Sequence, residues 1–152
     1  MTRTLVPVLV FFLSLALPLA ADELDDLVAK FEAERSKPYA ERTQAAGQFA
    51  RMKGDRARDV LLRLYRDEKD ANVQNLLLRA LAVHEGPAVR AAVLGALGDF
   101  GKPALQNTAA QSIAGRMDVE LVRRAVELLA DARASEGFTT LLRRALVSTR
   151  EE

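Results

Sequence analysis

The stretch "PAVRAAVLGALGDFG", residues 87–101, is repeated in altered form as "VELVRRAVELLADARA", residues 119–134. Aligning residues 89–93 with residues 122–126 gives an offset of 33, and the same step backwards from Val93 reaches the apolar Val60. Apolar residues recur every three or four positions in both stretches, which predicts amphipathic helices. The chain therefore carries the same helix more than once.

The segments between these helices also repeat. The triplets at 73–75 (VQN), 105–107 (LQN) and 138–140 (FTT) superpose at offsets of 32 and 33. No segment shows the alternation of a half-buried strand. A period in the low thirties that contains two short helices is typical of an α-solenoid, whose helical hairpins bury their apolar faces by stacking.

This period predicts eight helices in four pairs: 22–35 with 38–53, 55–66 with 72–84, 87–99 with 103–115, and 118–132 with 136–148. A second phasing, with the helix at 72–84 as the first of its pair, is also open, but the 33-residue register aligns more pairs. The first pair matches weakly, as terminal capping repeats tend to do.

Short-range signals mark the ends of these helices. Aspartates at the starts are expected N-caps, prolines are expected in first turns, and two glycines are expected to turn left-handed after helices. The residues are Asp22, Asp55 and Asp118, Pro87 and Pro103, and Gly101 and Gly115.

The motifs "AVRAAVLGALGDFG" and "LVRRAVELLADA" resemble the HEAT-like repeat family, and "LLRLYRDEKDANVQNLLLRAL" matches with Gln74 in place of an arginine. The resemblance covers roughly residues 54–146. It implies an all-α fold, a short right-handed α-solenoid of about four stacked helical hairpins. It implies no activity, because the matching residues are mostly structural.

The N-terminus has the order of a secretory signal peptide. A basic start at Arg3 precedes an apolar run over residues 5–19, which ends at Ala20 and Ala21 before an acidic segment. The expected organisation is a signal peptide at 1–21, a HEAT-like domain at 22–148 and a tail at 149–152. Cleavage after Ala20 and after Ala21 both stay open. The product is expected to be periplasmic or secreted, without stable membrane insertion; an uncleaved anchor is the alternative.

Composition excludes several classes of function. The chain has 22 Lys+Arg, 21 Asp+Glu and no Cys. Balanced charge argues against nucleic-acid binding, which needs excess basic residues to neutralise phosphate. Without Cys, disulfides and thiolate metal sites are excluded.

No catalytic constellation is apparent, and neither a cofactor nor a metal is expected. His84 is the only histidine; at a helix end it is expected to complement the helix dipole. Ser112 lacks a nucleophile elbow, and the acidic cluster at 22–26 lacks the spacing of a calcium loop.

The second helices carry a repeated polar face. Positions four residues apart share a helix face, and amides, hydroxyls and guanidiniums there suit hydrogen bonding to a peptide. In the resembled family this face usually lines the concave side. The expected partner-binding residues are Gln74, Asn75, Arg79, Gln106, Asn107, Gln111, Thr140 and Arg144.

The leading functional hypothesis is an exported, non-catalytic scaffold or adaptor that binds a protein or peptide on its concave face. One alternative is a structural module that self-associates, as a homo-oligomer through the solenoid ends, or docks onto an envelope complex. Another is an accessory subunit of an enzyme.

Overall fold

The computed structural model describes residues 16–37, 39–114, 119–131 and 133–148, and within these ranges the chain is all-helical, with no strand. The predicted signal residues 1–15, the caps Gly115 and Asp118 and the tail at 149–152 lie outside this part. The elements are α1 (Ala16–Ala33), α2 (Tyr39–Gln48), the 3-10 helix η1 (Phe49–Arg51), α3 (Asp55–Asp67), α4 (Ala71–Leu81), α5 (Pro87–Leu97), α6 (Pro103–Ile113), α7 (Val119–Leu129) and α8 (Glu136–Ser148).

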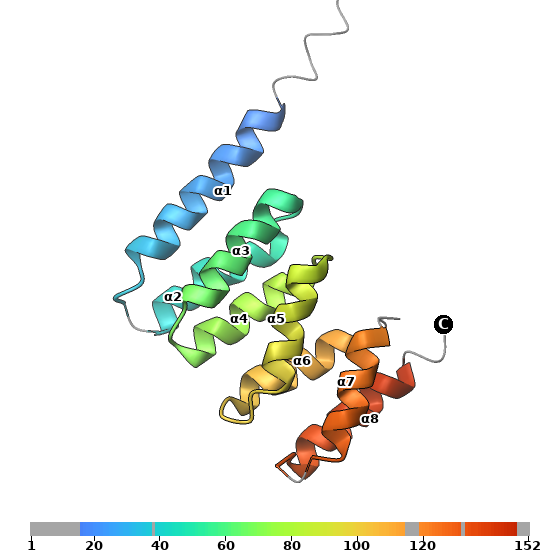
Figure 1. Ribbon diagram of the computed structural model, residues 1–152. Helices are drawn as coiled ribbons and strands as arrows, with labels where there is room; N and C mark the ends of the chain where they lie inside the picture. Colours follow the sequence, from blue (N-terminus) through green and yellow to red (C-terminus); the bar gives the residue numbers. More distant parts are fainter. Residues whose placement is uncertain (1–15, 38, 115–118, 132, 149–152) are drawn as a thin grey trace, which may run out of the picture.

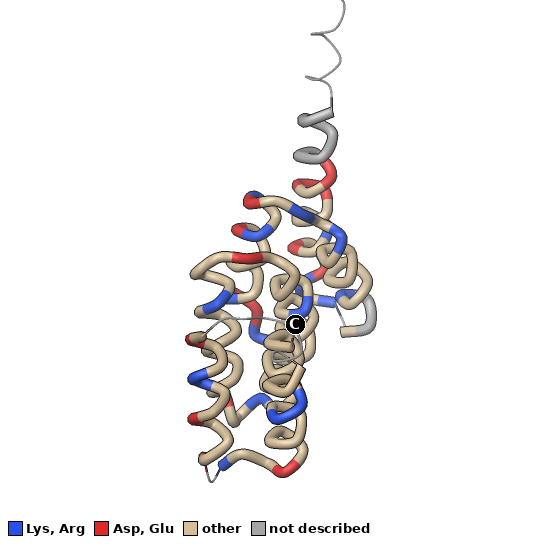
Figure 2. Tube along the Cα trace, turned by 90° about the vertical axis from the view of Figure 1, so that its right-hand side faces the viewer, with Lys and Arg blue, Asp and Glu red and all other residues tan. Residues whose placement is uncertain are grey.

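The helices pack as consecutive pairs. Helix α1 contacts α2, α3 contacts α4, α5 contacts α6 and α7 contacts α8. The second helices also pack in the order α2, α4, α6, α8, while α5 lies between α3 and α7. The pairs follow one another from α1 at one end to α8 at the other (Figure 1). Seen from the side, lysine, arginine, aspartate and glutamate are spread along the chain (Figure 2).

The first helices repeat every 32 residues, so the predicted offset of 33 is wrong for them. Helices α3, α5 and α7 begin at residues 55, 87 and 119. The buried Val89 and Val93 therefore correspond to the buried Leu121 and Ala125, and Val126 is exposed instead. The offset of 33 holds only for α6 and α8, which begin at 103 and 136. The connection before α8 is one residue longer than the connection before α6.

Glycine and proline set three of the helix starts. Gly54 and Gly86 precede α3 and α5 with φ of 92° and 121°, a region that L side chains rarely adopt. Pro87 occupies the first turn of α5 and Pro103 the first turn of α6, as predicted. Both prolines fit because the first-turn amides have no intrahelical acceptor.

Three other predicted helix ends differ. The N-cap of α3 is Gly54 rather than Asp55, whose carboxylate binds Arg58 instead. Gly101 has no positive φ, because α5 has already ended at Leu97. Helix α1 begins at Ala16, so Asp22 lies inside it; Pro18 falls in the first turn and no breaker separates it from Asp22.

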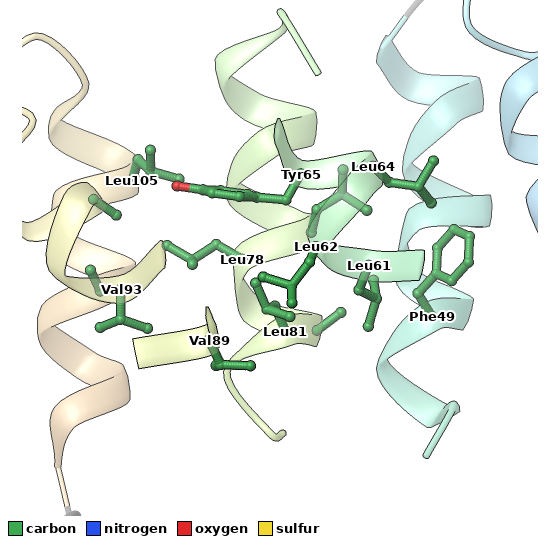
Figure 3. Packing of buried hydrophobic residues seen from close by; sticks show 14 of the residues in the cluster. Phe49, Leu61, Leu62, Leu64, Tyr65, Leu78, Leu81, Val89, Val93 and Leu105 are labelled. Carbon is green, nitrogen blue, oxygen red and sulfur yellow. The ribbon is translucent and has the colours of Figure 1, made fainter. Parts of the chain in front are cut away.

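A continuous apolar core runs between the two helix layers. It includes the fully buried Leu61, Leu64, Leu78 and Leu97, from α3, α4 and α5. Figure 3 shows side chains of α3, α4 and α5 meeting in this core, with Phe49 at one side and Leu105 at the other. Because each pair buries one face against the next, no pair is expected to be stable alone.

One ion pair is buried in this packing. Arg42 of α2 donates to Glu68, which follows α3, and the two side chains are only 7% and 4% exposed. Glu68 Oε1 also accepts the backbone N–H groups of Lys69 and Asp70, both at 2.8 Å. The carboxylate thus joins the first two pairs and holds the turn before α4, where Asp70 caps the helix.

Candidate interaction surface

The second helices carry a polar surface across α4, α6 and α8. Six of the predicted residues lie on it, and we call this set the amide ridge. Arg79, Gln111, Thr140 and Arg144 are exposed, while Asn75 and Asn107 are half-buried. Because α6 packs against both α4 and α8, the three helices bring these side chains into neighbouring rows. The amide ridge comprises Asn75, Arg79, Asn107, Gln111, Thr140 and Arg144.

Asn75 holds an acceptor without a partner. Its Oδ1 is buried and accepts no hydrogen bond within the described part of the chain. A buried polar atom without a hydrogen bond costs about 1–3 kcal/mol and is rare in native proteins. Because this oxygen has almost no exposed surface, the ridge side chains that a partner can reach directly are the four exposed ones.

The ridge is tied together between helices by a contact that sequence reasoning missed. The Nε of Arg79 on α4 donates to the hydroxyl of Thr108 on α6 at 3.4 Å, and Thr108 is buried. Thr108 lies three residues before Gln111 on the same helix, and this spacing could have identified it from the sequence as a neighbour of the ridge. The contact holds the Nε of Arg79 in place, although the residue as a whole stays exposed.

Gln74 and Gln106 are not on the exposed ridge, which corrects their predicted placement. Gln74 donates from Nε2 to the backbone carbonyl of Tyr65 at 3.2 Å, and Gln106 donates to that of Leu97 at 3.0 Å. Both side chains are buried. Each amide donates to a backbone carbonyl near the C-terminal end of the preceding first helix, where carbonyls lack N–H donors from their own helix. Their repetition is therefore a packing feature between paired helices.

His84 lies beside a separate open pocket of about 590 Å³. The imidazole is buried, with Nε2 lacking a hydrogen-bond partner. Burial and the nearby charge of Arg58 lower the pKa of His84, against a hydrogen bond to the Met52 backbone that raises it. The predicted dipole role of a charged imidazole therefore does not apply at neutral pH. The pocket is lined by Ala50, Lys53, Gly54, Asp55, Arg58, Val83, His84 and Glu85.

Other polar side chains singled out in the sequence have structural partners. Ser112 donates from its hydroxyl to the carbonyl of Ala109 in its own helix at 2.8 Å. In the acidic N-terminal segment, Asp25 binds Arg56 of α3 at 2.7 Å. Among the described residues, no three His, Asp or Glu side chains are grouped to hold a metal ion.

None of the helices in the described ranges is long and apolar enough to cross a membrane. Comparisons with protein-family models, with curated proteins and with solved structures find no match for the chain.

Proposed function

We propose that the chain is an exported, non-catalytic scaffold that binds a protein or peptide across the amide ridge. The observation that carries the proposal is a row of exposed polar side chains, from Arg79 on α4 through Gln111 on α6 to Arg144 on α8, on three helices that pack in succession. A peptide backbone offers N–H and C=O groups along its whole length, and these side chains can accept from the first and donate to the second. The architecture that suits this role is a short right-handed HEAT-like solenoid of four hairpins.

The chemistry of the ridge supports a polar chain as the ligand. Asn107 and Gln111 each offer a donor and an acceptor, and Arg79 and Arg144 offer donors only. Amides of this kind bond a backbone without requiring one particular side chain. The balanced charge of the whole chain, 22 basic and 21 acidic residues, gives no basis for nucleic-acid binding.

Site-specific photocrosslinking in the exporting cell tests the ridge. We expect a crosslinking amino acid at Gln111 or Arg144 to capture a discrete partner. The matched control is Ala91, which is exposed on the first-helix layer. Arg79→Ala should abolish the crosslink at Gln111 while leaving the circular dichroism spectrum unchanged, because Arg79 is exposed. Crosslinks from Ala91 alone, or crosslinks insensitive to Arg79→Ala, would contradict the proposal.

Export is a second part of the proposal, and it rests on the order of residues 1–21. Mass spectrometry of the protein recovered from the periplasm or medium should give a new N-terminus at Ala21 or Asp22. An intact Met1 terminus in the membrane fraction would support the anchored alternative instead.

A further inference from the structure

The C-terminal end of the row exposes large apolar side chains. Val119 and Val126 of α7 and Val147 of α8 are 82%, 55% and 58% exposed. In the rest of the described chain, the only other large apolar side chains exposed in this way are Tyr39 and Val83. Apolar exposure is therefore concentrated on the last helix pair.

Comparison with the preceding pair shows why this end is open. Leu97 and Ile113 are fully buried, whereas the equivalent Leu129 and Leu146 are only partly buried. At a third position, the buried Ala110 of α6 is replaced by the exposed Arg143 of α8. In α5 and α6 these positions are covered by the next pair, and within the described residues no further pair covers α7 and α8.

The outward side of α7 is apolar and edged by arginine. Helix α7 meets α5 through Glu120, which pairs with Arg90 at 3.3 Å. Residues two, six and nine positions after Glu120 lie on the other side of a helix. These are Val122, Val126 and Leu129, and the exposed Arg123 and Arg143 have no ion-pair partner among the described residues. We call Val122, Val126, Leu129, Arg123 and Arg143 the tail face.

The opposite end of the row has a hollow with acids at its rim. The outward side of α1, away from α3, carries the exposed Glu23 and Asp26. These acids rim a hollow of about 410 Å³ between α1 and η1, with Leu27 and Met52 among its lining residues. Lys30 and Arg51 also line it, so the hollow is not uniformly acidic. We call Glu23, Asp26, Leu27 and Met52 the head face.

Ion pairs already join neighbouring first helices inside the chain. Arg56 and Arg63 of α3 pair with Asp25 and Glu32 of α1, at 2.7 and 3.4 Å. Arg90 of α5 pairs with Glu120 of α7. Ion pairs between an arginine and an acid on neighbouring first helices therefore occur at two junctions, and at the α5–α7 junction the arginine is on the earlier helix.

We propose that the tail face binds the head face of a second copy of this chain. Val126 and its apolar neighbours would enter the hollow beside Leu27, and Arg123 and Arg143 would lie against Glu23 and Asp26. The two faces lie at opposite ends of the row (Figure 1). The contact is therefore heterologous and extends into a longer row of copies instead of closing as a symmetric dimer.

Sedimentation of single-end variants tests this contact. The full chain, purified from an exporting host, should increase in mass with concentration. Val126→Arg blocks the tail face and Asp26→Arg blocks the head face; both side chains are exposed, so folding should be retained. Each variant alone should stay monomeric, and an equimolar mixture should form a dimer, doubling the mass.

The controls separate this contact from other forms of association. Val83→Arg changes an exposed valine away from both faces and should sediment as the unchanged chain does. Arg143→Glu is a second tail-face variant and should behave as Val126→Arg does. Dimers of Asp26→Arg alone would indicate tail-to-tail contact and overturn the proposal. A wild-type chain that stays monomeric at every soluble concentration would overturn it as well.

Discussion

Gln106 links α6 to α5 through a buried hydrogen bond from its side-chain amide to the backbone carbonyl of Leu97. Replacing it by leucine leaves the Leu97 carbonyl without its amide donor. We expect Gln106→Leu to lower the free energy of unfolding by about 1–3 kcal/mol, the usual cost of a buried group left unsatisfied. Chemical denaturation measures this change.

The matched control is Gln111→Leu on the same helix, because Gln111 is exposed. A surface substitution of this kind changes stability by about 0.5 kcal/mol or less. Equal effects of the two substitutions would mean that the Gln106 hydrogen bond contributes nothing to stability.

His84 should make stability depend on pH. Its pKa in the folded chain is lowered from 6.5, chiefly by burial. The unfolded chain therefore binds a proton at a pH where folded His84 is still neutral. As a result, the free energy of unfolding falls as the pH drops below 6.5. This decline should be complete once the pH is below the folded pKa. Asp131, whose pKa is lowered to about 2 by Arg133, loses its contribution in a more acidic range.

Nuclear magnetic resonance can follow this titration without assignment, because the chain has one histidine. The imidazole resonance should titrate below pH 6.5, and His84→Gln should remove the corresponding slope from the stability profile. A folded-state pKa at or above 6.5 would show that Nε2 is not held away from water.

At the scale of one helix, two glycines associated with α5 should respond in opposite ways to alanine. Gly86 has φ of 121° before the helix, so Gly86→Ala should cost about 1–2 kcal/mol. Gly95 lies inside the helix with open space where a Cβ would be added. Gly95→Ala should therefore stabilise the chain by about 0.5–1 kcal/mol. Thermal unfolding of both variants checks the sign, and a shared sign would contradict this account of α5.

Across the whole molecule, stability should be greatest in the middle of the row. Helices α4 and α6 each pack against second helices on both sides, whereas α8 has such a neighbour on one side only. Local opening is easiest where an element has few neighbours. Hydrogen exchange measured by mass spectrometry should be slowest in α4 and α6 and faster in α1 and α8. Uniform protection across all helices would indicate a single cooperative unit.

The sequence by itself determined that the described chain is helical and where its helices lie. Apolar spacing and the breakers between segments act within a few residues, so they can be recognised without knowing the neighbours. Pro87 and Pro103 marked helix starts for this reason. The six ridge residues were also found on accessible sides of their helices, because positions four apart must share a face.

Only the tertiary structure decided which of two adjacent apolar residues is buried. Helix α7 carries such neighbours at 121–122, 125–126 and 128–129, so the periodicity fits offsets of 32 and 33 equally. Packing against α5 and α8 buries the first of each, Leu121, Ala125 and Leu128. Packing within the α3–α4 and α5–α6 pairs likewise buried Gln74 and Gln106, while Val126 was left exposed. Burial depends on what lies on the other side of a helix, and that is a property of the fold that local sequence does not contain.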